Sequence, residues 1–229
     1  EIIISTGDEY HGIRGNGLFK STDKGVTFTQ MANTTPNVNN DFYYTRYIEY
    51  HPTKQGELYV VASSNLLKST DSGVTWTQVY QASGRIKSIG FNHLNEVLIS
   101  VDHYGIYKSL TGDLNTFNQI TNGIPIGTSN LNIDNCIVSV HEADRSIVYS
   151  LFADQDPNDA AKLVGKIYKS TDGGDNWEII TTKKSGFPTG DGVGRIGVAI
   201  YDENTIYAIH DSQFRRIAEE DKEETRGLT

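Results

Sequence analysis

The sequence has few of the features that tie a small chain together or insert it into a membrane. It contains a single cysteine, Cys136, so no internal disulfide can form. Cys136 stands in the apolar run 136–138, which favours a buried and unreactive thiol. No run approaches the roughly 20 consecutive apolar residues that a membrane-spanning helix needs. We therefore expect a core that holds without disulfides and a chain that does not insert into membranes.

Basic residues are also scarce. The chain has 20 Lys and Arg against 29 Asp and Glu, which gives a formal net charge of −9. A nucleic-acid-binding surface needs clustered Lys and Arg to displace counterions from phosphates, so no nucleic-acid partner is expected. The six histidines show no metal-ligand spacing, and no glycine loop has the strand–helix context of a phosphate-binding motif. Neither a metal nor a cofactor is therefore expected.

Glycine and tyrosine are abundant in contrast, and part of the glycine belongs to an internal repeat. Positions 21–28, 69–76 and 170–177 share the pattern Ser-x-Asp-x-Gly, followed by an aromatic residue that closes the segment. A degenerate copy at 109–117 carries one extra residue and has Thr111 in place of the aspartate. The shared residues of the three regular copies are Ser21, Asp23, Gly25, Phe28, Ser69, Asp71, Gly73, Trp76, Ser170, Asp172, Gly174 and Trp177.

Each copy lies between two short strand-like runs, which makes it a hairpin turn. The copy at 69–76 follows the apolar run 66–68 and precedes the run 77–80. An Asp side chain in such a turn accepts hydrogen bonds from backbone N–H groups shortly after it, and the glycine supplies a positive φ. We expect the closing aromatic ring to pack into the sheet, since it carries the largest apolar area. The repeated residues are therefore interpreted as structural rather than catalytic or metal-binding.

Two further strand-like runs precede each hairpin, such as 47–50 and 57–61 before the copy at 69–76. The repeating unit is then four strands in about 40 residues, which is the pattern of a propeller blade. The fold predicted is all-β, a β-propeller of four-stranded antiparallel blades over residues 1–210. Residues 211–229 are expected to form a charged tail or linker.

The count of blades predicts that this propeller is incomplete. The chain supplies three strands of a first blade, three complete blades and two strands of a fifth, or about four and a half blades. Unpaired strand edges at both ends would invite pairing with other strands. We therefore expect the remaining blades to come from a longer chain or from another subunit.

These segments resemble a known repeat. The pattern Ser-x-Asp-x-Gly-x-Thr-Trp at 69–76 resembles the Asp box, or bacterial neuraminidase repeat, of sialidases, xyloglucanase-like glycoside hydrolases, sortilin-type VPS10 domains and photosystem assembly factors. The run 167–177 is most similar to the VPS10, sortilin-like and xyloglucanase-like branch. The resemblance implies a propeller and a secreted or cell-surface location, but it fits many activities, because one fold hosts many functions.

Candidate binding residues lie in two classes of loop. Asp41, Asp134 and Asp191 stand in loops that lead into the first strand of a blade, and Asp41 is followed by Tyr43 and Tyr44, which are suited to stacking on sugars. Another class of loop holds Asp102 beside His103, and also Asp154 with Asp156. Aspartate is common in loops for its turn chemistry alone. A polar and aromatic binding face is therefore favoured over a catalytic acid pair, and the catalytic residues stay unknown.

The arginines do not favour a sialidase site. Resemblance to sialidases would imply three arginines that bind the substrate carboxylate, and Arg46, Arg85 and Arg195 all lie near the start of a blade. Their spacing from the apolar strand residues differs, however, and an offset of one residue reverses the face in a strand. The first hypothesis is a non-catalytic propeller scaffold or binding module of an exported protein, which binds a protein or glycan. The alternative is a glycoside hydrolase of the sialidase or xyloglucanase-like type, with a paired-acid mechanism.

Overall fold

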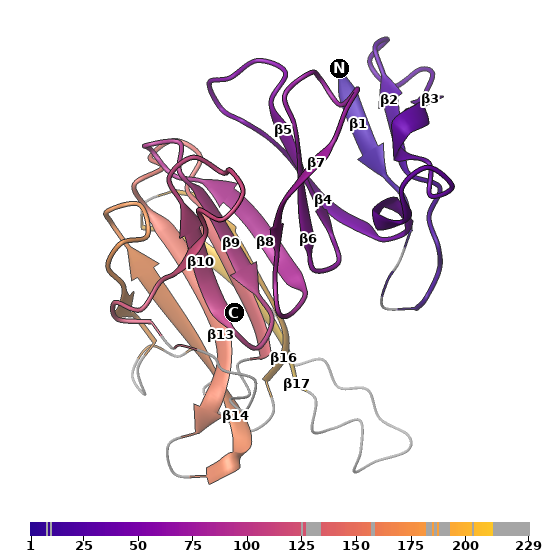
Figure 1. The fold of residues 1–229 in the computed structure, drawn as a ribbon. Coiled ribbons are helices and arrows are strands. Elements are labelled where there is room, and N and C mark those ends of the chain that lie inside the picture. Colours follow the sequence, from indigo (N-terminus) through magenta and orange to yellow (C-terminus); the bar gives the residue numbers. More distant parts are fainter. Residues whose placement is uncertain are drawn as a thin grey trace.

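The computed structural model describes residues 1–212, apart from positions 8, 10, 125, 127–133, 157–158, 182–184, 186, 188–192 and 203. Side chains are not described at 134–135, 153–164, 193–196 and 210–212. The described chain forms five antiparallel sheets (Figure 1). Its helical turns are two short 3-10 segments, η1 (Ala32–Thr34) and η2 (Asn40–Tyr43), and no described helix could cross a membrane.

Each sheet is a meander in which consecutive strands pair. The first sheet has three strands, β1 (Ile2–Ser5), β2 (Leu18–Ser21) and β3 (Thr29–Gln30). The second has β4 (Thr45–Tyr50), β5 (Leu58–Ala62), β6 (Asn65–Ser69) and β7 (Thr77–Gln81). The third has β8 (Ile86–Phe91), β9 (Val97–Val101), β10 (Gly105–Ser109) and β11 (Asn118–Gln119).

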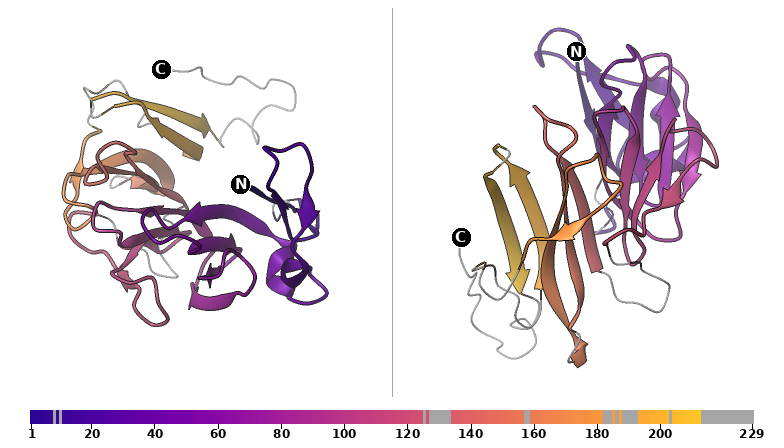
Figure 2. Two further views of the ribbon diagram at one scale, coloured as in Figure 1. Left: turned by 90° about the horizontal axis from the view of Figure 1, so that it is seen from above. Right: turned by 90° about the vertical axis from the view of Figure 1, so that its left-hand side faces the viewer.

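The fourth sheet has β12 (Asp134–Val140), β13 (Val148–Asp156), β14 (Asp159–Ser170) and β15 (Glu178–Ile179), and the fifth has β16 (Val193–Ile200) and β17 (Ile206–Ser212). Figure 2 shows the sheets following one another along an arc, with the first sheet at one end and the fifth at the other. The strands β4, β8, β12 and β16 are neighbours across the sheets. The prediction of an all-β fold built from four-stranded antiparallel blades is confirmed.

The core lies between successive sheets. Between the second and third sheets, Tyr59 and Val61 pack with Ile89 and Phe91, and the rings of Tyr59 and Phe91 meet edge to face at 5.5 Å. Every residue of β5 is buried, because sheets cover both of its faces. A run of apolar residues without polar alternation is what such a doubly covered strand requires.

The Ser-x-Asp-x-Gly turns share one hydrogen-bond pattern. Within the second sheet, Asp71 Oδ1 accepts from the backbone N–H of Thr75 at 2.8 Å, and Ser69 Oγ accepts from the N–H of Gly73 at 2.9 Å. The fourth sheet repeats this pattern with Asp172 and Asn176, at 3.0 Å. Gly73 has φ +85°, and a Cβ there would lie 2.4 Å from Met31 Cε of the region after β3. The glycine therefore allows both the turn and close packing on the preceding blade.

The closing aromatic residues differ in burial, and the expectation for Phe28 was wrong. Trp177 is 6% exposed and Trp76 is half-buried, but Phe28 is 39% exposed. Trp177 packs with residues of both the third and fourth sheets, including Leu98. No described sheet precedes the first one, so the ring of Phe28 has no such surface to pack against. Burial of this ring therefore depends on a neighbouring blade as well as on the turn.

Both ends of the arc expose residues that are buried in the inner blades. Ile4 of β1 is 41% exposed, whereas its counterpart in the second sheet, Val60, is fully buried. Tyr207 of β17 is 58% exposed, and its counterpart Tyr59 is fully buried. The first and fifth sheets therefore each present an apolar face of the kind that blades bury against one another.

The turn aspartates predict how the fold responds to acid. Hydrogen bonds from the side chain and backbone of Thr75 lower the pKa of Asp71 from 3.8 to about 2. Because the folded-state pKa lies below the unfolded value, these bonds contribute stability above pH 3.8 that is lost as the pH falls through about 2. We expect the Asp71→Asn variant to lose less thermal stability than the wild type between pH 5 and pH 2.5. Thermal melts check this, with Glu178→Gln on the exposed strand β15 as control. An equal acid loss in Asp71→Asn and wild type would contradict it.

Candidate functional site

One end of the blades collects most of the candidate residues. Because β4 pairs antiparallel with β5, the start of β4 at Thr45 lies opposite the end of β5 at Ala62. The third sheet repeats this, with Ile86 opposite Val101. We call this end the entry face: the described starts of β4, β8, β12 and β16, the loop before β4, and the turns between β5 and β6 and between β9 and β10. Both loop classes singled out in the sequence therefore meet at one face.

A β-bulge at the start of the inner strands shapes the entry face. In the second sheet the pairing skips Arg46, between Thr45 and Tyr47. In the third sheet it skips Lys87, between Ile86 and Ser88. A bulge redirects the side chain of its extra residue, and bulges are frequent next to binding sites. The repeated bulge therefore places a basic residue at the same point of two adjacent blades.

Lys87, which the sequence analysis did not single out, is the structural counterpart of Arg46. Arg85, which was considered instead, lies outside β8 and its Nε is 3.3 Å from Glu9 Oε1. Arg195 falls in the bulge of β16 between Val193 and Ile196, and its side chain is not described. The three arginines thus share no register position. Lys87 stands two residues before Ile89, just as Arg46 stands two residues before Ile48. This shared spacing could have identified Lys87 if lysine had been considered together with arginine.

Arg46 borders a pocket of about 240 Å³ at the entry face, lined by Ser5, Gly7, Glu9, Tyr44, Thr45 and Arg46. Arg46 is exposed, and no ion pair joins it to another residue of the described chain. Beside the pocket, the Arg14 guanidinium lies 4.9 Å from the centroid of the Tyr43 ring. The rings of Tyr43 and Tyr44 are 6.4 Å apart. Glu9 also lines the pocket, but its Oε1 accepts from Ser63 Oγ and lies 3.3 Å from Arg85 Nε. The pocket therefore combines the exposed guanidinium of Arg46 with aromatic surface and a carboxylate that is already paired.

The two described candidate acids of the entry face have partners within the protein. Asp41 Oδ1 accepts a hydrogen bond from Asn65 Nδ2 at 2.8 Å. Asp102 is 7% exposed, and its Oδ2 lies 3.2 Å from Lys87 Nζ. Next to it, His103 is exposed and has φ +67°, as the turn between β9 and β10 requires. Asp41 and Asp102 therefore hold loops to neighbouring segments.

The other candidate acids are less defined. Asp134 is the first residue of β12 and so begins at the entry face, but its side chain is not described. Asp191 lies outside the described residues. Asp154 and Asp156, expected in a loop, belong to β13, because β13 and β14 form a hairpin longer than those of the other blades. Their expected loop position is therefore wrong.

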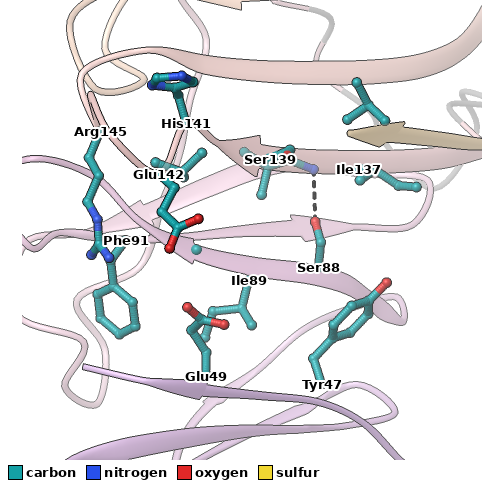
Figure 3. Close-up of a pocket in the computed structure, with 14 residues that line it drawn as sticks. Tyr47, Glu49, Ser88, Ile89, Phe91, Ile137, Ser139, His141, Glu142 and Arg145 are labelled. Atoms are coloured by element: carbon teal, nitrogen blue, oxygen red, sulfur yellow. Dashed lines mark hydrogen bonds between the residues drawn. The ribbon is translucent and has the colours of Figure 1, made fainter. Parts of the chain in front are cut away.

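A larger pocket, which the sequence did not reveal, lies where the inner strands face one another. This channel pocket has a volume of about 420 Å³, and its lining includes Tyr47, Glu49, Ser88, Ser139, Glu142 and Arg145. In Figure 3 the carboxylates of Glu49 and Glu142 extend toward one another from opposite sides, and Arg145 lies beside them. The strand pairing of the next two sheets shows that Gly90 of β8 and Ser139 of β12 occupy the position that Glu49 has in β4. A glutamate where the other blades have a small residue is the sequence signal that could have indicated this pocket.

Burial affects the charge of this pocket. It raises the pKa of Glu49 above the ordinary value of 4.5, and the Arg145 guanidinium opposes that rise. In the described part of the chain, no three His, Cys, Asp or Glu residues are arranged to hold a metal ion. Cys136 is fully buried, which raises the pKa of its thiol. The channel pocket therefore holds two carboxylates, one of them half-buried.

Comparison with known proteins identifies the fold. No protein-family model matches the sequence, and no curated protein matches it. Among solved structures, the GH74 xyloglucanase from Xanthomonas campestris has a TM-score of 0.64 at 15% identity, over 90% of this chain and 34% of the enzyme. The fold is that of a β-propeller. An ancestral GH74 enzyme has a TM-score of 0.60 at 16% identity, over 93% of this chain and 29% of its own.

A third similar structure is the alpha-L-arabinanase of Penicillium chrysogenum, with a TM-score of 0.52 at 14% identity over 86% of this chain and 66% of that one. The chain spans about a third of the length of the two GH74 structures. Likeness at such low identity shows the propeller fold alone, since one fold hosts many activities.

Proposed function

We propose that this chain is a non-catalytic β-propeller module of an exported protein and that it binds a protein or glycan at its entry face. The observation that carries the proposal is the pocket beside Arg46. Its guanidinium is exposed, has no ion-pair partner among the described residues, and stands next to Tyr44 at a bulge. Loops on a rigid scaffold commonly carry binding residues.

The chemistry of the pocket favours a ligand with a carboxylate. A guanidinium forms two parallel hydrogen bonds with a carboxylate, which gives both energy and orientation. The neighbouring rings of Tyr43 and Tyr44 offer apolar faces on which sugar rings can stack. An acidic glycan, such as one built from uronic acids, satisfies both features and is the ligand class that we propose.

The two candidate acids whose side chains are described, Asp41 and Asp102, favour binding over hydrolysis. A glycosidase needs two carboxyl groups that flank one bond, about 5 Å or 6.5–9.5 Å apart. Asp41 is bonded to Asn65, and Asp102 is paired with Lys87. Each carboxylate thus has a structural role that accounts for its presence at the entry face.

Binding of an acidic oligosaccharide tests the proposal. We expect the chain to bind oligogalacturonides more tightly than their methyl-esterified forms, and the Arg46→Ala variant to bind them about tenfold more weakly, because one charge-assisted contact is lost. Titration calorimetry measures both. Lys24→Ala, in the exposed turn after β2, is the control. Equal binding by Arg46→Ala and wild type would reject this site.

The alternative function is a glycoside hydrolase of the sialidase or xyloglucanase-like type. The observation that favours it is that Asp134 begins β12 at the same face as Asp41. The same preparation should be incubated with fluorogenic sialosides and xyloglucan oligosaccharides. Hydrolysis well above that of an Asp41→Asn/Asp134→Asn double variant would replace the binding proposal with this one.

The apolar faces at the ends of the arc are a further proposed contact surface. Ile4 and Tyr207 occupy positions that are buried between blades elsewhere in the chain. A blade with the same repeat, from another subunit or from a longer chain, has the complementary apolar surface. Such a blade is therefore the protein partner that we propose for these faces.

A further inference from the structure

The channel pocket has an imbalance of charge that the fold does not explain. Glu49 comes from β4, and Glu142 and Arg145 come from the turn between β12 and β13. The two carboxylates face one another across the cavity in Figure 3, so two negative charges oppose one positive charge. Glu49 is half-buried and Glu142 is exposed at the rim of the cavity. A ligand that carries positive charge would complement the excess negative charge of this wall.

The cavity also has the size and surface of a ligand site. Its volume of about 420 Å³ lies within the usual range of small-molecule pockets, about 300–1,000 Å³. Tyr47 is 40% exposed although it stands on an inner strand, and it lines the same cavity, with its ring extending toward Ser88 in Figure 3. Cations bind favourably over tyrosine rings. This exposed ring is an observation independent of the two acids, and it also points to a cation.

Two other polar side chains of the wall are already engaged. Ser88 Oγ accepts from the N–H of Val138 at 2.8 Å. His141 is 8% exposed, and its Nδ1 accepts from the N–H of Asp144 at 2.8 Å. The groups that remain to contact a ligand include the two carboxylates, the hydroxyl of Ser139, the guanidinium of Arg145 and the ring of Tyr47.

We propose that the channel pocket binds a primary ammonium group, held between the carboxylates of Glu49 and Glu142 and against the ring of Tyr47. An ammonium group has three donors, so it can bond to both carboxylates at once. Arg145 balances one of the two carboxylate charges, so the site has room for one further positive charge. The ligand is an amino sugar or the side chain of a lysine, which present the same group. This site is separate from the Arg46 pocket, so either proposal can fail alone.

Paired ligands that differ only in charge test the site. Glucosamine oligomers are compared with N-acetylglucosamine oligomers, and lysine amide is compared with norleucine amide. We expect the charged member of at least one pair to bind about tenfold or more tightly than its neutral partner. NMR titration of the whole chain at pH 7 measures this. Equal affinity within both pairs, or no binding of either charged ligand at 10 mM added ligand, would overturn the proposal.

Substitutions assign the binding to the pocket. Glu49→Gln and Glu142→Gln retain side-chain shape and remove one charge each, and each is expected to weaken binding of the charged ligand about tenfold. Tyr47→Leu should weaken it by a smaller factor. Glu178→Gln on β15 is the matched control and should bind as the wild type does. Circular dichroism confirms that each variant is folded. Wild-type affinity in folded Glu49→Gln and Glu142→Gln would also overturn the proposal.

Discussion

Replacing Trp177 by alanine is expected to lower the free energy of unfolding by about 3–5 kcal/mol. Its ring is 6% exposed and belongs to the cluster that joins the third and fourth sheets. Its Nε1 also donates to Gly174 O at 3.0 Å within the turn. The truncation would open a cavity between two sheets and leave that carbonyl without its donor. Urea denaturation followed by circular dichroism measures the loss.

The chain supplies its own control for this substitution. Phe28 occupies the same turn position in the first sheet but is 39% exposed. Phe28→Ala should therefore cost less than about 1 kcal/mol, close to the range of surface substitutions. Trp76→Ala should fall between the two, because Trp76 is half-buried and its ring meets Phe42 at 5.6 Å. A loss for Trp177→Ala no larger than that for Phe28→Ala would show that contact with the preceding blade does not determine the effect.

Replacing Lys108 by methionine is expected to destabilise the fold by about 3 kcal/mol, because it leaves a buried carboxylate without its cation. The Lys108 side chain is 9% exposed and that of Glu96 is 10% exposed, with 2.8 Å between Nζ and Oε2. Lys108 also contacts Asp175 in the turn of the following sheet. Burial opposes the charged form of Lys108, but the bonds to Asp175 and Glu96 prevail and raise its pKa.

A double substitution separates the two possible causes of that loss. Lys108→Met combined with Glu96→Gln removes both charges, and Asn92 Nδ2, 2.6 Å from Glu96 Oε2, retains an acceptor. We expect the double variant to recover most of the stability. Lys20→Met is the control, since Lys20 and Glu1 form the equivalent pair at 2.8 Å with side chains 25% and 37% exposed. Urea denaturation that shows equal losses for the single and double variants would mean that the lysine acts through packing alone.

The fold could be predicted because the sequence pattern of one blade is repeated several times along the chain. Each copy of the Ser-x-Asp-x-Gly turn marks the same point of a blade, so one reading of the copy at 69–76 fixes the strands around the others. The burial of Phe28 could not be inferred in this way. It depends on whether another sheet lies against the turn, and the repeat is the same with or without that neighbour.

The site was only partly predictable. The loop residues Tyr44 and Arg46 border one pocket because they are adjacent in sequence and follow one loop. Lys87 was missed because only arginines were compared, although Lys87 and Arg46 occupy the same bulge position in adjacent blades. The facing of Glu49 and Glu142 depends on how separate blades converge, which strand periodicity within one blade does not specify.

Two ion pairs between blades have the same direction along the chain. Lys68 reaches forward to Asp113 in the turn of the third sheet, at 2.9 Å, and Lys108 reaches forward to Asp175 in the turn of the fourth. Each of these two turns therefore makes its ion pair with a lysine of the preceding blade. A ribosome releases the chain in this same order, N-terminal part first. A new blade can thus begin to fold during synthesis against one that has already emerged, and it completes its burial when the next blade follows.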